Sequence, residues 1–328
     1  MFKIFAKKIN YANSTDKELL SCIRSEQWSN LNDNQKIAIL QEVENRNAAE
    51  QERPVCKVNK NNKMDSYGRY SLGENAIEVN LKSAGNNNSY NILDTVYHEG
   101  EHAHQVNCIK YGVNPPKGLP KETREMCELE FNGYRHPPQY QTIGGKRIIT
   151  REPIIEYGKR TCEADSRNFA VSKVMEDKEI FRGDPEYANY LQNTSDTIEN
   201  YNSIKMAEIR KQQSELIWEA RKNNDISQER YEDMTHRAWN QQEQPAFAEA
   251  AKLLDTIRRE KRESLYHATQ QKDAGHHSHY SGLKAEKEGS ALGNENKKEE
   301  ILSKCSDKME DIQKCVEEEQ ENEIKNSR

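Results

Sequence analysis

The sequence predicts an α+β protein that is mainly helical, with a small and mainly antiparallel sheet and a helical C-terminal extension. Helix formers with apolar residues at helical spacing fill most of the chain, as in the stretch from Ile37 to Val43. The segments with strand-like alternation cluster before residue 90, and residues 147–157 are either a further strand or a connector. Hydrophobic residues make up 34% of the chain and charged residues 32%. This composition can fill one core of about half the chain, with the rest in exposed helices or tails.

The N-terminal helices are predicted from their capping residues. Ser14, Thr15 and Asp16 predict the start of a helix through residues 17–24. Their side chains can accept hydrogen bonds from the backbone N–H groups of its first turn. A second helix begins near residue 31, and its apolar stripe continues until Pro54 ends the run.

Two strands are predicted after this second helix. Residues 55–58 form a short apolar strand. Residues 70–82 alternate around Ile77 and Val79, as expected for a half-buried strand or one arm of a hairpin. The loop at residues 83–89 then leads into another helix, so the local order is strand, loop, helix.

That helix contains the stretch TVYHEGEHAHQ at residues 95–105. His98 and His102 are four residues apart, and such neighbours on a helix approach within about 5–6 Å at their Cβ atoms. Two imidazoles on one face can therefore ligate a single metal ion, with Glu99 beside them. The opposite face of this helix is apolar, which is the arrangement that a metal site in a cleft requires.

The whole chain divides into four predicted parts. Residues 1–180 form the domain that carries the metal motif, including a short helix at 120–131 and a longer one from about 155 to 176. Residues 181–271 form a helical extension with sparse apolar stripes. Residues 272–296 have the composition of a flexible linker. Residues 297–328 form an amphipathic helix that either binds a partner or folds back on this chain.

Charge and cysteine content exclude several classes of protein. The 49 Lys and Arg residues against 55 Asp and Glu residues give a net charge of −6, without a long basic stripe, so we expect no nucleic-acid partner. No stretch approaches the length of a membrane span, and the first residues lack the pattern of a cleaved secretion signal. Seven scattered cysteines favour a reducing compartment. We therefore expect a protein that is cytoplasmic, or exported without a cleaved signal peptide.

A catalytic zinc site needs three protein ligands and one open position, so a third ligand must accompany His98 and His102. Cys108 lies six residues after the second histidine, but the pattern that uses this position requires glycine at residue 105, where this chain has glutamine. The alternative is a carboxylate on a second helix, and Glu163 in the stretch CEADSRNFA meets this requirement.

These two motifs resemble those of a known family. HEGEH followed by E-A-D-x-x-x-F-A resembles the ImmA/IrrE type of zincin metallopeptidase, whose second motif is similar to E-A-N-x-F-A. The chain also resembles zincin domains of bacterial toxins and effectors, which have H-E-G-x-H-A-x-Q and a later E-x-D-A element. His98, Glu99, His102 and Gln105 match the first motif and Glu163 matches the second, within roughly residues 28–172.

The resemblance implies a gluzincin-like metallopeptidase that hydrolyses a protein or peptide substrate. Zn²⁺ would be bound by His98, His102 and Glu163, and Glu99 would act as the general base toward a zinc-activated water. The alternative is a helical protein-interaction module whose zinc site is structural or inactive. A purely structural zinc usually has four protein ligands and no use for Glu99, which favours the enzyme.

Several other polar residues are further candidates for a role at the metal site. Asp165 either orients a ligand histidine or, as we expect, is a solvated surface carboxylate. Arg167 either stabilises an oxyanion or forms an ion pair with Glu163 one turn away, and His104 is expected at the surface. Further candidates for stabilising an oxyanion are Tyr134, Tyr157 and His136. The linker histidines His276, His277 and His279 either bind metal loosely or, as we expect, are solvated.

Overall fold

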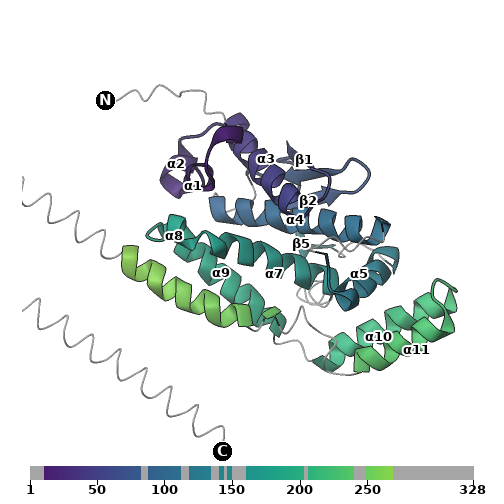
Figure 1. Ribbon diagram of the computed structural model, residues 1–328. Helices are drawn as coiled ribbons and strands as arrows, with labels where there is room; N and C mark the ends of the chain where they lie inside the picture. Colours follow the sequence, from purple (N-terminus) through teal and green to yellow (C-terminus); the bar gives the residue numbers. More distant parts are fainter. Residues whose placement is uncertain are drawn as a thin grey trace, which may run out of the picture. The chain divides into compact units, whose positions relative to one another are not determined.

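The computed structural model describes most of the chain up to residue 268 (Figure 1). The described ranges are 11–82, 88–111, 118–133, 140–143, 146–149, 160–202, 206–239, 249–250 and 252–268. The predicted linker and C-terminal helix lie outside the described residues, as do Tyr134, Tyr157, His136, His276, His277 and His279. Within the described part, no helix combines the length and the apolar character needed to cross a bilayer.

The first helix begins where its capping residues predict. After the short turn η1 (Tyr11–Asn13), Thr15 caps α1 (Asp16–Ser21) in a reciprocal pair of hydrogen bonds with Glu18. The next two helices are α2 (Ser25–Ser29) and α3 (Asp33–Glu50), and Asn32 caps α3 in the same way with Gln35. The predicted capping of the first helix is confirmed, and α3 ends before Pro54 as expected.

The first sheet is mixed, whereas we expected a mainly antiparallel sheet. Its strands are β1 (Lys57–Lys60), β2 (Gly68–Ser71) and β3 (Ala76–Val79), in the order β1-β3-β2. The short turn after β2 makes β2 and β3 antiparallel, whereas β1 and β3 are parallel. The most apolar strand takes the centre, because Ala76, Ile77 and Val79 are all buried. β2 is left at an edge of the sheet.

A second sheet lies after residue 90, outside the expected cluster of strands, and its second strand overlaps the segment predicted to be either a strand or a connector. It consists of β4 (Tyr140–Ile143) and β5 (Lys146–Ile149), which pair antiparallel. The sequences of these strands, YQTI and KRII, lack the alternation of apolar and polar residues that identifies strands in a sequence. The fold class, α+β with helix predominating, holds.

The long helix α4 (Ser89–Tyr111) lies at the centre of the fold (Figure 1). It contacts α3, β2 and β3 on one side and packs along α7 (Thr161–Glu176) on the other. Three further helices contribute to the same hydrophobic core: α8 (Lys178–Phe181), α9 (Pro185–Asn202) and the helix at 252–268. The predicted domain boundary at residue 180 runs through this core, whose members include Val171 and Val174 on one side and Phe181 and Tyr187 on the other.

A second, smaller hydrophobic cluster joins α5 (Lys121–Gly133), α10 (Met206–Lys222) and α11 (Gln228–Trp239). Met126 and Leu129 on α5 pack against Ile217 on α10 and Met234 on α11. Since α5 also contacts α4 and α7, this cluster is anchored next to the helices that carry the predicted metal ligands.

Candidate metal centre

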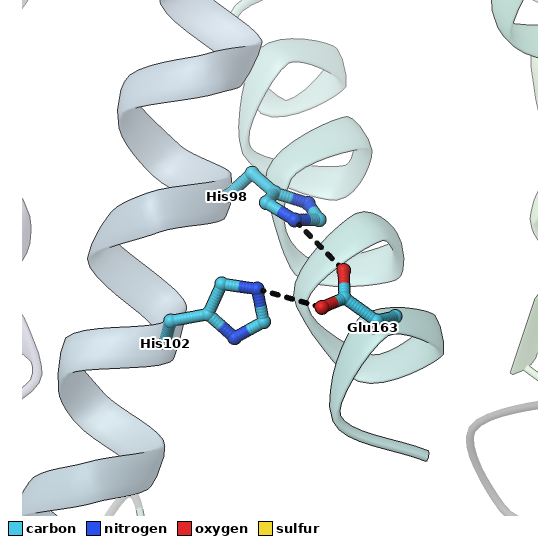
Figure 2. Close-up of side chains that lie close together, drawn as sticks. All are labelled: His98, His102 and Glu163. Carbon is cyan, nitrogen blue, oxygen red and sulfur yellow. Dashed lines mark ion pairs between the residues drawn. The ribbon is translucent and has the colours of Figure 1, made fainter. Parts of the chain in front are cut away.

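The structure brings the three predicted metal ligands together between α4 and α7 (Figure 2). His98 and His102 project from successive turns of α4, with ring centroids 4.8 Å apart. Glu163 projects from the first turn of α7 toward both rings. Its Oε2 lies 3.4 Å from His98 Nε2, and its Oε1 lies 3.5 Å from His102 Nε2.

The spacing of these donor atoms fits a bound metal ion. N–H···O hydrogen bonds normally measure about 2.7–3.2 Å, so the two contacts are long for hydrogen bonds. Two ligand atoms on a tetrahedral ion with bonds of about 2.0–2.1 Å lie about 3.3 Å apart. Glu163 Oε2 is buried without a hydrogen-bond partner, which is costly unless another group satisfies it. The three side chains can therefore hold a metal ion.

The three ligands are unequally buried, with His98 the most exposed to solvent. The side chain of Glu163 is 6% exposed and that of His102 is 10% exposed, against 21% for His98. Three protein ligands and one accessible side leave room for a further ligand from solvent. A structural site would instead be closed by a fourth protein side chain.

The charges of His102 and Glu163 depend strongly on each other. Burial alone lowers the pKa of His102, but the Glu163 carboxylate outweighs it and raises this pKa to about 10. Burial likewise opposes the ionisation of Glu163, yet His102 and His98 hold its pKa well below the usual range. Without metal, the two side chains form an ion pair at neutral pH. A metal ion must then displace the proton of His102.

Gln105 orients His102 toward the ligand position. The side-chain oxygen of Gln105 lies 2.9 Å from His102 Nδ1, and its amide nitrogen donates to Asp165 Oδ2 (2.9 Å) and Ser166 Oγ (3.0 Å). Because the amide nitrogen is fixed by these acceptors, the oxygen accepts a proton from Nδ1, which leaves Nε2 free to face Glu163. The sequence placed Gln105 in the motif but gave it no role, and Ser166 was not identified.

The prediction for Asp165 as a solvated surface carboxylate is wrong. It accepts the hydrogen bond from Gln105, and burial raises its pKa to about 6, against the opposing effects of Gln105 and His102. The helical-wheel angle placed Asp165 away from Glu163 correctly. It could not show that α4 packs along that side of α7.

Glu130 fixes the start of α7, a role that no sequence motif indicates. The residue before the helix, Arg160, makes no side-chain capping bond. Instead, Glu130 on α5 accepts the backbone N–H groups of Thr161 (2.7 Å) and Cys162 (2.8 Å). These groups lie directly before Glu163, and an anion at a helix N-terminus is favourable. Glu130 is 5% exposed, so the contact is buried.

Glu99 lies beside the ligands without joining them. It is partly buried, and its Cγ is 3.6 Å from the point that a Cβ on Gly68 would occupy. The same Cβ would lie 2.4 Å from Thr95 Cγ2 and 2.9 Å from the Glu78 carbonyl oxygen. Glycine at the start of β2 therefore lets this strand approach α4 next to Glu99. The sequence did not point to Gly68.

Gly100, the middle residue of HEGEH, has a similar role toward α3. A Cβ there would lie 2.8 Å from both Arg53 Nη2 and Asn47 Nδ2. Arg53 forms a fully buried bidentate ion pair with Glu44, with N···O distances of 2.7 and 2.9 Å. The absence of a side chain at Gly100 thus gives this buried pair its space beneath the metal-binding helix.

His104 and Cys108 are both buried, so the prediction that His104 is a surface histidine is wrong. His104 is 3% exposed, and its Nε2 lies 3.6 Å from Cys108 Sγ. The apolar stripe of α4 indicated neighbours on one side only, whereas other elements contact this helix on several sides. The rejection of Cys108 agrees with the structure, because within the described residues the only group of three or more possible metal ligands is His98, His102 and Glu163.

Arg167 lies one turn after Glu163 on α7 and acts on a different carboxylate. Burial raises the pKa of Asp94, on α4, to about 6. A hydrogen bond of 2.8 Å from Tyr190 and the charges of His98 and Arg167 oppose this effect. Arg167 is therefore within electrostatic reach of the side of α4 that carries His98.

Comparisons with known proteins add no assignment. No protein-family model matches the chain, and the comparisons found no match among curated proteins or solved structures. What the site can do must therefore be argued from its own residues.

Proposed function

We propose that this protein is a zinc metallopeptidase of the gluzincin type with a zincin-like domain. One observation carries the proposal: two histidines on α4 and a buried glutamate on α7 converge at ligand spacing, with Glu99 directly after the first histidine. Imidazole nitrogens and a carboxylate are ligands that zinc accepts, and three of them are typical of a catalytic rather than a structural site.

The chemistry divides between the metal and the chain. Zinc bound by His98, His102 and Glu163 would lower the pKa of a water to about 7 and polarise the scissile carbonyl. Glu99 takes a proton from the attacking water and passes it to the leaving amine, as a general base and then a general acid. Gln105 keeps the imidazole of His102 in the tautomer that presents Nε2.

β2 is the proposed docking edge for an extended peptide. It lies at the edge of the first sheet and contacts α4 beside Glu99. An edge strand presents unpaired backbone N–H and C=O groups, to which a peptide can add as a further strand. A substrate aligned there would have its backbone held near Glu99, which supports a protein or peptide as substrate.

The second candidate is a helical protein-interaction module with a structural or inactive zinc site. The long helices and the α10–α11 pair, with Trp218 56% exposed and Trp239 61% exposed, are compatible with partner binding. The open side at His98 and the position of Glu99 favour the peptidase, because a structural site needs neither.

The deciding experiment is the Glu99→Gln variant of the full chain. It leaves all three ligands intact, so we expect about one zinc per chain by elemental analysis. Hydrolysis of a mixed peptide library should fall by about 10²–10⁴-fold, because the general base is lost. Glu26→Gln, at an exposed position on α2, is the matched control and should retain both properties. A Glu99→Gln protein that holds zinc and cleaves at the wild-type rate would disprove the mechanism.

The proposed setting is a reducing compartment, either the cytoplasm or the site of action of a protein exported without a cleaved signal. The described cysteines, Cys22, Cys56, Cys108, Cys127 and Cys162, are free thiols in the structure. Burial raises the pKa of the Cys127 and Cys162 thiols, so they are unreactive rather than poised for disulfide exchange.

A further inference from the structure

The first turn of α7 is capped by a side chain from another helix. Arg160 occupies the capping position, where Ser, Thr, Asp and Asn are preferred, and makes no capping bond. The two carboxylate oxygens of Glu130 on α5 accept the N–H groups of Thr161 and Cys162 instead, at 2.7 and 2.8 Å. A local cap would fix only where α7 begins along the chain. A cap from α5 also fixes where α7 lies relative to its neighbours.

The same turn is held from two further directions. The carbonyl oxygen of Cys162 accepts a hydrogen bond of 3.0 Å from the side-chain amide of Gln105 on α4. The hydroxyl of Thr161 accepts one of 3.2 Å from the buried Gln213 on α10. Glu163 is the next residue, so the backbone directly before the third ligand is held by α4, α5 and α10.

A metal centre tolerates little displacement of its ligands. Metal–ligand distances normally hold to within about 0.2 Å, whereas a slip of an α-helix by one residue moves it by about 1.5 Å and turns it by about 100°. His98 and His102 lie on one helix, so local geometry sets their spacing. Glu163 lies on another helix, and its distances of 3.4 and 3.5 Å to the two imidazoles depend on where α7 begins.

The end of α5 contacts the metal centre at two places. Glu130 is 5% exposed, and burying a carboxylate is costly unless it accepts hydrogen bonds. Both of its oxygens meet this condition at the helix that carries Glu163. The ring of the next residue, Phe131, lies edge to face with the ring of His102, with centroids 6.4 Å apart. α5 therefore adjoins a ligand on α4 as well as the ligand helix α7.

We propose that Glu130 is a positioning residue of the metal centre that acts through Glu163. By holding the first turn of α7, it presents the Glu163 carboxylate to His98 and His102. This role rests on the proposed function, because it concerns the same metal site. It is measured through metal affinity rather than through hydrolysis.

The test is the zinc affinity of the full chain at pH 7, measured by competition with a chelator of known affinity. Glu130→Gln keeps one acceptor oxygen but turns an amide nitrogen toward the second N–H group. We expect its zinc affinity to fall by about tenfold. Glu125→Gln is the matched control, because Glu125 is also a shielded carboxylate of α5, 12% exposed, but pairs with Arg237 on α11 at 2.5 Å. It should bind zinc like the wild type.

Thr161→Pro tests the same contact from the other side. Proline is well tolerated at the first position of a helix, and the extended backbone of Arg160, with ψ 136°, suits a residue before proline. The variant keeps Glu130 and the helix but removes one N–H group that Glu130 accepts. Its zinc affinity should therefore also fall, which gives a measurement if Glu130→Gln does not fold.

A double variant separates positioning from a general loss of stability. If Glu130 acts through Glu163, then Glu130→Gln should have no further effect once Glu163 is removed. The combination of Glu130→Gln with Glu163→Ala should therefore bind zinc as weakly as Glu163→Ala alone. A merely structural role would lower the affinity equally in both backgrounds.

Three results would overturn this role of Glu130 and leave the proposed peptidase intact. Glu130→Gln and Thr161→Pro could both bind zinc like the wild type. Glu125→Gln could weaken zinc binding as much as Glu130→Gln does. The effect of Glu130→Gln could persist in the Glu163→Ala background. Conversely, a wild type that binds zinc, is weakened by Glu130→Gln as expected and hydrolyses no peptide would count against the proposed function alone.

Discussion

Buried charged groups on the two sides of α4 differ in how completely they are paired. Toward α3, the Arg53 guanidinium and the Glu44 carboxylate form a closed bidentate pair, and Gln51 donates to the buried Glu101. Toward α7, the Nε2 atoms of His98 and His102 lie 3.4 and 3.5 Å from the Glu163 carboxylate oxygens, and Glu163 Oε2 has no hydrogen-bond partner.

This difference separates a structural network from a binding site on the same helix. Buried charges are normally paired and hydrogen-bonded, because an unsatisfied one costs free energy. On the α3 side, the Arg53–Glu44 pair satisfies that requirement within the chain. On the α7 side, Glu163 Oε2 lacks a hydrogen-bond partner until a further group binds, so changes on the two sides should affect different measurements.

The largest expected effect is the loss of metal when a ligand on the α7 side is removed. His98→Ala, His102→Ala and Glu163→Ala should each lose stoichiometric zinc and hydrolysis together, because a two-ligand site binds zinc weakly. Elemental analysis after dialysis against a weak chelator measures this. Unchanged zinc content in Glu163→Ala would move the third ligand to another residue while leaving Glu99 its role.

On the α3 side, Arg53→Met should cost stability instead of metal affinity. It leaves the Glu44 carboxylate buried without its partner, which typically costs about 3–5 kcal/mol of the free energy of unfolding. Denaturant unfolding of the metal-free protein measures this. The double variant Arg53→Met with Glu44→Leu should recover much of the loss, since no charge is left unpaired. A double variant as unstable as the single one would contradict this account of the pair.

Gln105→Leu should have an intermediate effect on the α7 side. The ligands stay, but His102 loses the acceptor that fixes its tautomer, and such losses typically cost about 10–100-fold in metal affinity. Competition with a chelator of known affinity measures this. Gln105→Glu keeps an acceptor for His102 Nδ1 and should bind metal more tightly than Gln105→Leu. Equal affinities would show that Gln105 serves packing alone.

A further effect is a dependence of metal affinity on pH that only the α7 side should show. The raised pKa of His102, about 10 without metal, means that zinc must displace one proton at neutral pH. Metal affinity should therefore rise by about tenfold per pH unit between pH 7 and pH 9. Glu163 is already ionised throughout this range, since its pKa is lowered. A flat profile would show that His102 is neutral before the metal binds.

The raised pKa of His102 also predicts how the stability of the metal-free protein depends on pH. This dependence is opposite in sign to that of the metal affinity. A raised pKa of His102 stabilises the folded state fully below the unfolded value of about 6.5. This contribution is lost as the pH rises through about 10. Stability without metal should thus fall over the range in which metal affinity increases.

The sequence predicted the parts of the site that depend on local spacing. His98 and His102 share a face because helix geometry brings residues four apart together, and the E-A-D element identified Glu163 as a ligand candidate. Gln105 and Asp165 meet only because α4 packs along α7. No spacing rule reports on that contact, and for this reason Asp165 was expected in solvent.

The fold shows the same division between local and long-range information. Caps such as Thr15 and Asn32 act within one turn, so the starts of α1 and α3 are readable from the sequence. The parallel pairing of β1 with β3 joins strands separated by β2. It depends on which strand takes the centre of the sheet, and the alternation within each strand carries no information about that choice.

The bond between Glu130 and the first turn of α7 has a consequence for insertions and deletions. Glu130 and Thr161 are 31 residues apart, yet they are joined directly by a hydrogen bond. The stretch between them is therefore a closed loop whose ends are fixed independently of its contour length. Doubling the length of such a loop costs only about 0.6 kcal/mol in closure entropy. Homologous chains can therefore differ widely in length between the two motifs while Glu163 still meets the histidines.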